Sequence, residues 1–245
     1  MRIKIVAANW KMNTTLADAH VLADGVRLEV EHLEKIEVVL CPPTIWLTEL
    51  AHNLPVGSLP HLMLGAQNMY SEEKGAFTGE TSPLMIKEVA EFVIIGHSER
   101  THLFHEDFEL ISGKVQAALR HGLTPILCLG EDEHTSGSKR QLVHALNHIV
   151  KELSHQQLEQ LVVAYEPVWA IGTGQAATAE YAEDVCAALR AGLTAKTRIL
   201  YGGSATDENA KSFLEQENID GLLIGGASLK LKTFVTICQI ADQLS

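Results

Sequence analysis

The sequence predicts an α/β protein, a closed (β/α)8 barrel of eight parallel strands, on three observations. Eight short apolar runs rich in β-branched residues are near-continuous rather than alternating, as expected of strands buried on both faces. Segments with helical periodicity separate most of these runs, and the strand–helix unit recurs about every 30 residues. Neither a run of consecutive strands nor a Pro/Ser-rich linker interrupts the pattern, which indicates one domain over residues 1–245.

The predicted elements follow one another along the chain. The strands are expected at residues 3–8, 36–41, 62–66, 92–96, 125–129, 161–165, 198–201 and 221–224. The clearest helices are expected at residues 16–33, 107–121, 139–153 and 178–191. Three further helix starts are indicated: Thr44 is expected to cap a helix over residues 45–54, Thr81 stands near Pro83 at a first turn, and Thr206 precedes the acidic pair Asp207-Glu208.

An open doubly wound sheet is the alternative to a closed barrel. A dinucleotide-binding sheet of that kind would carry GxGxxG after its first strand, but here that strand ends in Asn9-Trp10-Lys11. The number of strands and the lack of edge-strand features favour closure.

The charge balance narrows the choice of partners. The chain has 31 acidic and 19 basic residues and a formal net charge of −12, which disfavours binding to nucleic acid or to anionic membranes. A phosphorylated substrate would also be repelled by this field. A site for such a substrate must therefore supply its own local positive potential.

Cysteine and histidine usage argues against a disulfide framework and against a metal site. The four cysteines are widely spaced without a CxxC pair, which favours a reducing, cytoplasmic location. The N-terminal apolar run is too short for a signal peptide, and no stretch reaches membrane length. His144 and His148 lie four residues apart, but on a predicted outer helix without an evident third ligand, so we expect no metal there.

Residues that follow the predicted strands should share one face, because barrel enzymes carry their reactive groups at strand C-termini. Gly202-Gly203-Ser204 follows the seventh strand and Gly225-Gly226 follows the eighth. Open backbone N–H groups next to a helix N-terminus form a phosphate site, and barrels commonly have one after these strands. The alternative is that the glycines only permit tight turns.

Glu166 and His97 are the candidate acid–base groups. Glu166 lies between an apolar strand and a proline, where partial desolvation would raise its pKa toward that of a general base. His97 precedes a short predicted helix, whose N-terminus disfavours imidazolium and favours a neutral hydrogen-bond donor. The alternatives are a rim or helix-capping glutamate and a core histidine bonded to backbone.

Lys11 and Asn9 follow the first strand, and Lys11 is the candidate for the required positive charge. The segment after Glu166 combines proline, glycines and small residues around an apolar tip, which indicates a lid that excludes water. A merely long loop is the alternative. The predicted lid comprises Pro167, Val168, Trp169, Ala170, Ile171, Gly172, Thr173, Gly174, Gln175, Ala176 and Ala177.

Five strings of residues together resemble the triosephosphate isomerase family, in the family's order and over nearly the whole chain. They are Asn9-Trp10-Lys11, Gly96-His97-Ser98-Glu99-Arg100, Ala164-Tyr165-Glu166-Pro167-Val168-Trp169-Ala170-Ile171-Gly172-Thr173-Gly174, Tyr201-Gly202-Gly203-Ser204 and Gly225-Gly226-Ala227-Ser228-Leu229. The resemblance implies a TIM barrel that interconverts glyceraldehyde 3-phosphate and dihydroxyacetone phosphate without metal or cofactor. This family is itself a standard worked example of catalysis by a carboxylate base, a neutral histidine and a closing loop.

The resemblance also implies a role for each matching residue. Glu166 is the base, His97 the neutral electrophile, Lys11 the stabiliser of the enediolate, and Asn9 positions the site. Supporting residues are Glu99, which organises Lys11, and Cys128, which is structural and lies under the glutamate. The phosphate is expected to be held by backbone groups at Gly172, Ser204, Gly225 and Gly226.

The family is typically dimeric, with a loop after the third strand completing the neighbouring site. Here that loop is residues 67–80, and Thr78 is the expected contact, although its Phe77 could equally pack on its own barrel. The chain departs from the family pattern at three places: at Thr101, in the segment after Glu131, and at Gln175 in the lid. The first two put the details of the interface in question, and the third puts the kinetics of the lid in question.

Two other functions are compatible with a phosphate-binding barrel. A Schiff-base aldolase would need a desolvated lysine at a mid-barrel strand end, where this chain has Glu166. A non-catalytic anion-binding barrel would not require Glu166, His97 and Lys11 together with an intact lid.

Overall fold

Eight parallel strands close into one barrel in chain order in the computed structural model, which describes residues 2–54, 61–135, 137–170 and 177–245. Each strand pairs in parallel with its neighbours, and β1 pairs with β8 to complete the ring. The strands are β1 (Lys4–Asn9), β2 (Ile36–Cys41), β3 (Leu62–Ala66), β4 (Phe92–Ile95), β5 (Thr124–Glu131), β6 (Val162–Pro167), β7 (Arg198–Tyr201) and β8 (Gly221–Ile224). The predicted (β/α)8 barrel is therefore confirmed.

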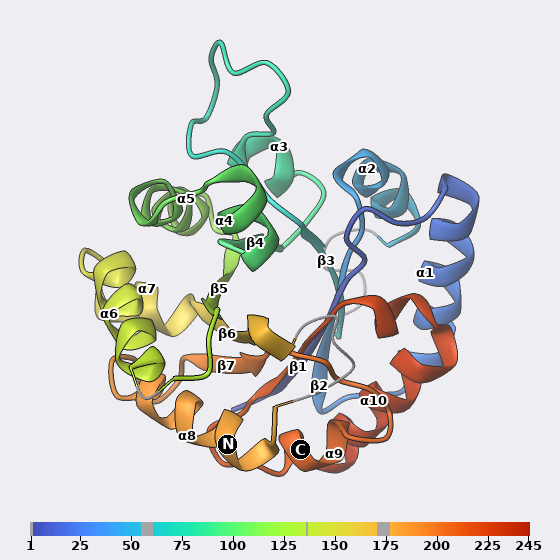
Figure 1. Cartoon of the computed structure of the whole chain (residues 1–245). Helices are drawn as coiled ribbons and strands as arrows, with labels where there is room; N and C mark the ends of the chain where they lie inside the picture. The colour runs from blue at the N-terminus through green and yellow to red at the C-terminus, as the bar shows by residue number, and fades with distance from the viewer. Residues whose placement is uncertain (1, 55–60, 136, 171–176) are drawn as a thin grey trace.

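Helices surround the strands as an outer ring (Figure 1). They are α1 (Leu16–Val30), α2 (Thr44–Asn53), α3 (Pro83–Lys87), α4 (Ser98–Phe104), α5 (Phe108–Arg120), α6 (Ser138–Val150), α7 (His155–Gln160), α8 (Ala179–Arg190), α9 (Ala210–Leu214) and α10 (Leu231–Gln243). Two 3-10 turns, η1 (Val168–Ala170) and η2 (Gly226–Leu229), follow β6 and β8. No helix among the described residues is long and apolar enough to cross a membrane.

Alternate residues of each strand point into two separate cores, as the two-residue period of a strand requires. Ile5 and Ala7 of β1 belong to the cluster inside the barrel, whereas Val6 and Ala8 pack against the surrounding helices. Both faces are buried, which explains why the strands are near-continuous apolar runs in the sequence.

Several predicted boundaries were wrong. Thr44 is not a cap, because Pro43 occupies the N-cap position of α2 and no side chain caps it. Thr206 precedes a turn, and α9 begins only at Ala210. Pro167, predicted as the first lid residue, is the last residue of β6.

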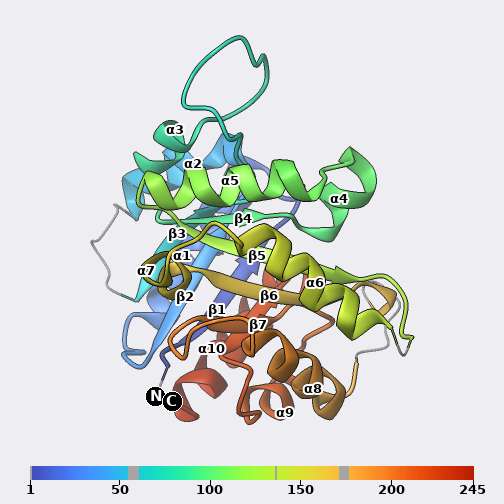
Figure 2. The same cartoon turned by 90° about the vertical axis from the view of Figure 1, so that its left-hand side faces the viewer.

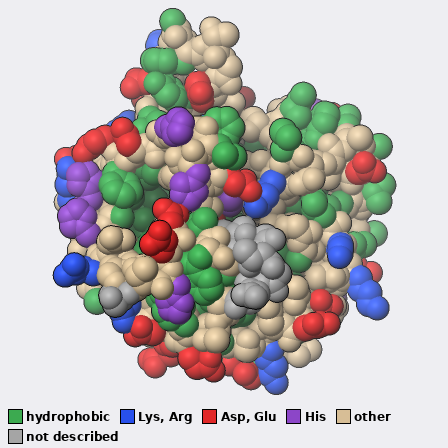
Figure 3. Space-filling view, in the orientation of Figure 1, with side chains coloured by type: hydrophobic (Ala, Val, Ile, Leu, Met, Phe, Trp, Pro, Cys, Tyr) green, Lys and Arg blue, Asp and Glu red, His purple; other side chains and the backbone are tan. Residues whose placement is uncertain are grey.

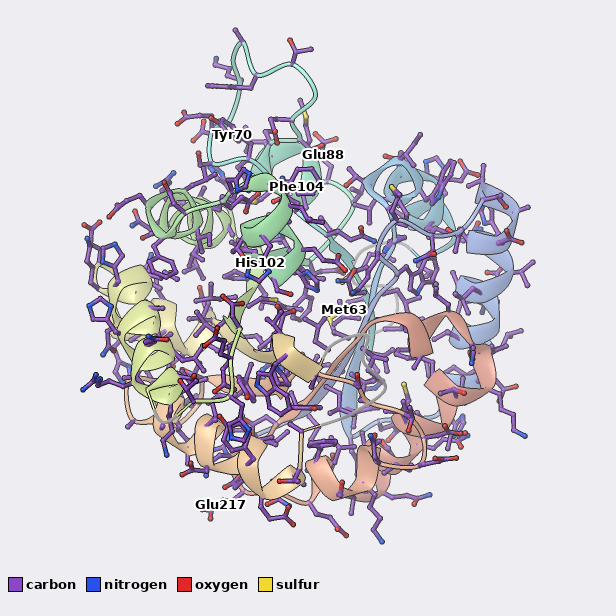
Figure 4. All side chains as sticks on the ribbon, viewed as in Figure 1. Met63, Tyr70, Glu88, His102, Phe104 and Glu217 are labelled. Atoms are coloured by element: carbon purple, nitrogen blue, oxygen red, sulfur yellow. The ribbon has the colours of Figure 1, made fainter. Side chains whose placement is uncertain are left out.

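The loop between β3 and α3 projects from the barrel (Figures 1 and 2). Tyr70 stands at its base (Figure 4), and its ring contacts Phe77 at a centroid distance of 4.6 Å. Every residue from 72 to 80 is exposed. Little of the loop beyond Tyr70 therefore packs against its own barrel.

The first and last described segments of the chain lie side by side in Figure 2. Lys4 Nζ of β1 donates to the carbonyl oxygen of Leu244, just after α10, at 2.9 Å. The first strand and the last helix are thus held together, which ties both ends of the chain to one side of the barrel.

Candidate active site

A cavity of about 630 Å³ is formed by residues that follow the barrel strands. Its lining includes every predicted catalytic and phosphate-binding residue that the structure describes: Asn9, Lys11, His97, Glu166, Ser204, Gly225 and Gly226. Gly172 lies outside the described residues, as do the other predicted lid residues from 171 to 176. The structure therefore brings together side chains at or just after the C-terminal ends of β1, β4 and β6 with the turns after β7 and β8.

A larger cavity of about 960 Å³ lies beside it, between α4, α5, β5 and α6. It shares no lining residue with the first and contains none of the predicted catalytic groups. Figure 3 shows a hollow with hydrophobic side chains at its floor and histidine and acidic side chains at its edge, and Figure 4 places His102 on α4. Size alone does not identify an active site, and we take the smaller cavity because it holds the reactive groups.

Glu166 is fully buried at the end of β6, and its two carboxylate oxygens have different surroundings. Oε2 accepts a hydrogen bond of 2.9 Å from the backbone N–H of Ser98. Oε1 lies 3.1 Å from His97 Nε2 but has no hydrogen-bond partner among the described residues. One oxygen is thus anchored while the other remains able to accept a proton.

Cys128 lies beneath this carboxylate on β5 and is buried. Burial raises the pKa of its thiol well above the ordinary value, and the charge of Glu166 and a hydrogen bond to it act in the same direction. The thiol therefore stays protonated and serves as a neutral neighbour of the glutamate.

Gly202 is the residue after β7, and its lack of a side chain lets the Glu166 side chain pack close to the backbone at this point. A methyl group added at Gly202 would lie 3.1 Å from Glu166 Cγ and 3.2 Å from the Tyr165 carbonyl oxygen. The Gly202 N–H also donates to that oxygen at 2.7 Å, so the backbone cannot easily retreat.

We therefore expect Gly202→Ala to displace the carboxylate and to lower kcat by roughly 10- to 100-fold, since small misplacements of reacting groups are costly. Steady-state kinetics would measure this. Gly137→Ala is the matched control, because a methyl group there meets nothing within 4 Å. Wild-type kcat in Gly202→Ala would show that the glycine does not set the position of the base.

His97 occupies the N-cap position of α4 and is almost buried. Its Nδ1 accepts a hydrogen bond of 3.2 Å from the backbone N–H of Glu99. A nitrogen that accepts carries no proton, so the proton of the neutral ring is on Nε2, which faces Glu166 and the cavity. In this tautomer the ring can donate from Nε2.

Lys11 is held in place by contacts to its side chain and to its backbone. Its ammonium lies 2.6 Å from Glu99 Oε1, and its backbone N–H donates to Asn9 Oδ1 at 3.0 Å. Gln67 donates to its carbonyl oxygen at 2.9 Å, a contact that sequence reasoning missed. Its backbone has a φ of 53°, in the left-handed region that costs a non-glycine residue energy. These contacts hold the side chain toward the cavity.

The turns after β7 and β8 present unoccupied donors. The backbone N–H groups of Ser204, Gly225 and Gly226 donate to no atom of the described residues. Ser228 holds the second turn, since its N–H and its hydroxyl both donate to the Gly225 carbonyl. A methyl group at Gly225 would lie 3.2 Å from Lys11 Cε. The Lys11 side chain therefore lies next to the backbone N–H donors of this turn. The arrangement can bind an anion.

Glu131 is a buried residue to which sequence reasoning assigned no role. Its Oε2 accepts hydrogen bonds from Tyr165 Oη at 2.5 Å and from Trp169 Nε1 at 3.1 Å, and its Oε1 accepts one from Tyr181 Oη at 2.5 Å. A charged residue ending the apolar run of β5 was the available signal. Its partners come from β6, η1 and α8, which only the fold brings together.

Burial and the hydrogen bonds to Glu131 raise the pKa values of Tyr165 and Tyr181 above the ordinary value for tyrosine. Both phenols therefore remain donors throughout the neutral pH range.

The turn after β7 contacts η1 directly. The hydroxyl of Ser204 donates a hydrogen bond of 3.1 Å to the carbonyl oxygen of Ala170 in η1.

Comparison with known proteins identifies the family. The family model described as triosephosphate isomerase matches residues 4–241. The chain belongs to the triosephosphate isomerase family. It is 46% identical over 251 aligned residues to the triosephosphate isomerase of Dehalococcoides mccartyi strain BAV1, covering 98% of this chain and 97% of the relative. The protein of that name from strain CBDB1 of the same species is similar to the same extent.

Membership of the triosephosphate isomerase family makes the chain an isomerase. The geometry agrees with this. The candidate lysine, Lys11, is paired with Glu99 rather than isolated in an apolar pocket, where a Schiff-base amine would lie.

Proposed function

We propose that this chain interconverts D-glyceraldehyde 3-phosphate and dihydroxyacetone phosphate through an enediolate, in glycolysis and gluconeogenesis, without a cofactor. The observation that carries the proposal is the state of Glu166. It is a fully buried carboxylate with one oxygen anchored by Ser98 and the other unpartnered, next to the Nε2 of a cavity-lining histidine.

Proton transfer begins at Glu166 Oε1. This oxygen takes a proton from the substrate carbon beside the carbonyl and later returns it to the neighbouring carbon, so that the reaction needs no net proton. Ser98 keeps the other oxygen in place during both steps.

The negative charge of the enediolate is stabilised by His97 and Lys11. The Nε2–H of His97 donates to the substrate oxygens and moves protons between them, while the Lys11 ammonium supplies a positive charge nearby. Asn9 and Glu99 are positioning residues, since each holds Lys11 through a direct contact. Cys128 supports Glu166 from below and takes no part in the chemistry.

The phosphate group is bound by the backbone N–H groups of Ser204, Gly225 and Gly226, which are supplemented by Gly172 when the lid covers the substrate. These donors give the local positive potential that a chain with a net charge of −12 requires. Phosphate binding far from the reacting carbons also contributes to lid closure.

The test is interconversion of the two triose phosphates by the purified protein in chelator-treated buffer. Turnover in that buffer is the expected result. If a folded protein binds a phosphate ester without turnover, the non-catalytic binding barrel is correct. A covalent adduct on Lys11 after borohydride treatment with substrate would indicate an aldolase instead.

We also propose a cytoplasmic homodimer of single-domain subunits, which does not bind nucleic acid or membranes. The loop of residues 67–80 projects from its own barrel (Figure 2). The side chain of Phe77 in this loop is exposed. Further large apolar side chains are exposed on neighbouring segments: Met12, Ile45, Leu84 and Met85. The free cysteines are compatible with a reducing compartment.

Thr78→Arg tests the dimer. Thr78 is exposed near the loop tip, and an arginine buried there against a partner would be an unpaired charge. We expect light scattering to show a dimer for the wild type and a shift of at least about 10-fold toward monomer for the variant. Thr236→Arg on α10 is the control. A wild type that is monomeric at assay concentration and fully active would contradict the proposal.

A further inference from the structure

The turn between β7 and α9 is closed by the side-chain amide of Asn209. This residue occupies the N-cap position of α9 and lines the substrate cavity. Its Oδ1 accepts a hydrogen bond of 2.8 Å from the backbone N–H of Thr206, and its Nδ2 donates one of 3.1 Å to the carbonyl oxygen of Ser204. The side chain therefore joins the end of the turn to its beginning.

The two contacts also fix the orientation of the amide. An asparagine side chain offers a carbonyl acceptor and an NH2 donor, and in this turn the acceptor faces an N–H while the donor faces a carbonyl oxygen. The reverse orientation would set donor against donor and acceptor against acceptor, so it is excluded. Aspartate lacks the donor and alanine lacks both groups, so neither could hold the turn in the same way.

Ser204 is the residue that this amide holds. Its hydroxyl donates to the Ala170 carbonyl oxygen at 3.1 Å, and its own carbonyl oxygen accepts from Asn209. Its backbone N–H donates to no atom of the described residues and is one of the proposed phosphate donors. Because the side chain and the carbonyl are both held, rotation of Ser204 about its backbone bonds is restricted, and its N–H is held in one direction.

Asn209 is the one partner that the Ser204 carbonyl oxygen has in the part of the chain that the structure describes. Thr206, Asp207 and Glu208, which complete the turn, are exposed, so packing restrains them little. Without the amide, the carbonyl could turn toward water, and Ser204 would have several accessible orientations. A donor that is ordered before the ligand arrives binds it at a lower entropic cost.

We propose that Asn209 is a positioning residue for the phosphate group of the substrate: its amide holds Ser204, and with it the phosphate-binding N–H, in one orientation. The inference rests on the proposed function, because it requires that this N–H binds phosphate. Among the described residues, Asn209 makes no hydrogen bond with the proposed base, electrophile or ammonium. Its effect should therefore be confined to the phosphate end of the substrate.

The test measures the dissociation constant of glycerol 3-phosphate by titration calorimetry, together with steady-state kinetics. A neutral hydrogen bond changes an equilibrium constant by roughly 2- to 12-fold. We expect Asn209→Ala to raise this Kd and the KM for triose phosphate by that factor, with kcat within about twofold of wild type, since binding is weakened equally before and during the reaction. Ser212→Ala is the matched control and should leave Kd and KM unchanged. The Ser212 hydroxyl donates to the Asn209 carbonyl oxygen at 2.8 Å, at the same helix start but outside the turn.

Unphosphorylated glyceraldehyde separates a phosphate effect from a general disturbance of the site. It lacks the group that Ser204 is proposed to bind but would undergo the same proton transfer. Its kcat/KM should therefore be the same in Asn209→Ala and in the wild type.

Two results would overturn the proposal: an unchanged Kd for glycerol 3-phosphate in Asn209→Ala, or an equal loss of activity toward phosphorylated and unphosphorylated substrates. If the wild type binds glycerol 3-phosphate without turnover of triose phosphate, the proposed function fails and calorimetry alone decides the role of Asn209. A wild type that does not bind glycerol 3-phosphate would refute the phosphate site and the role of Asn209 with it.

Discussion

Replacing Glu166 with glutamine is expected to lower kcat by about 10²- to 10⁴-fold, the range in which a general base contributes to catalysis. The amide has nearly the same shape and can still accept the hydrogen bond from Ser98. It cannot take a proton from carbon. Since Glu166 is not among the groups proposed to bind phosphate, KM should change only a few-fold.

Glu208→Gln is the matched control for this variant. Glu208 lines the same cavity but is exposed and has no proposed role in proton transfer. Circular dichroism and thermal unfolding should be the same for both variants and the wild type. A Glu166→Gln protein with normal kcat would show that another group abstracts the proton.

Replacing Lys11 with methionine is expected to reduce kcat/KM by about 10²- to 10³-fold or more, through effects on both constants. Methionine retains an apolar chain beside Gly225 but removes the ammonium. The net charge of −12 makes this loss severe, because few other cations offset the field that a phosphorylated substrate meets. Steady-state kinetics at several salt concentrations would measure the loss.

The Lys11 variant also leaves Glu99 without the ammonium that lies 2.6 Å from it. The unpaired carboxylate could repel substrate by itself. The double variant Lys11→Met, Glu99→Gln separates the two effects. If the double variant recovers most of the activity, the ammonium acts mainly by neutralising Glu99, and its direct role in stabilising the enediolate is refuted.

The barrel and the residues around its cavity could be predicted from the sequence because both depend on strand order. Strands buried on both faces are continuous apolar runs, and the residue after each run must lie at the same end of a parallel barrel. Glu166, His97 and Lys11 follow or end three different predicted strands, and in the structure they line one cavity.

Helix starts were less predictable. Threonine has a local preference for the N-cap, but α2 begins after Pro43 and α9 after Asn209, since the packing of the preceding loop decides where the chain turns. Glu131 was missed for a related reason. Its three donors come from segments up to 50 residues away, and no local pattern relates them.

The sequence by itself determined the fold class, the family and which strand-end residues line the cavity, since these depend on strand periodicity and on short strings at strand ends. Only the tertiary structure decided how the groups are oriented: which oxygen of Glu166 is unpartnered among the described residues, which nitrogen of His97 accepts, and how Trp169 meets Glu131. Orientation depends on contacts between segments distant in the chain, which local propensities do not encode.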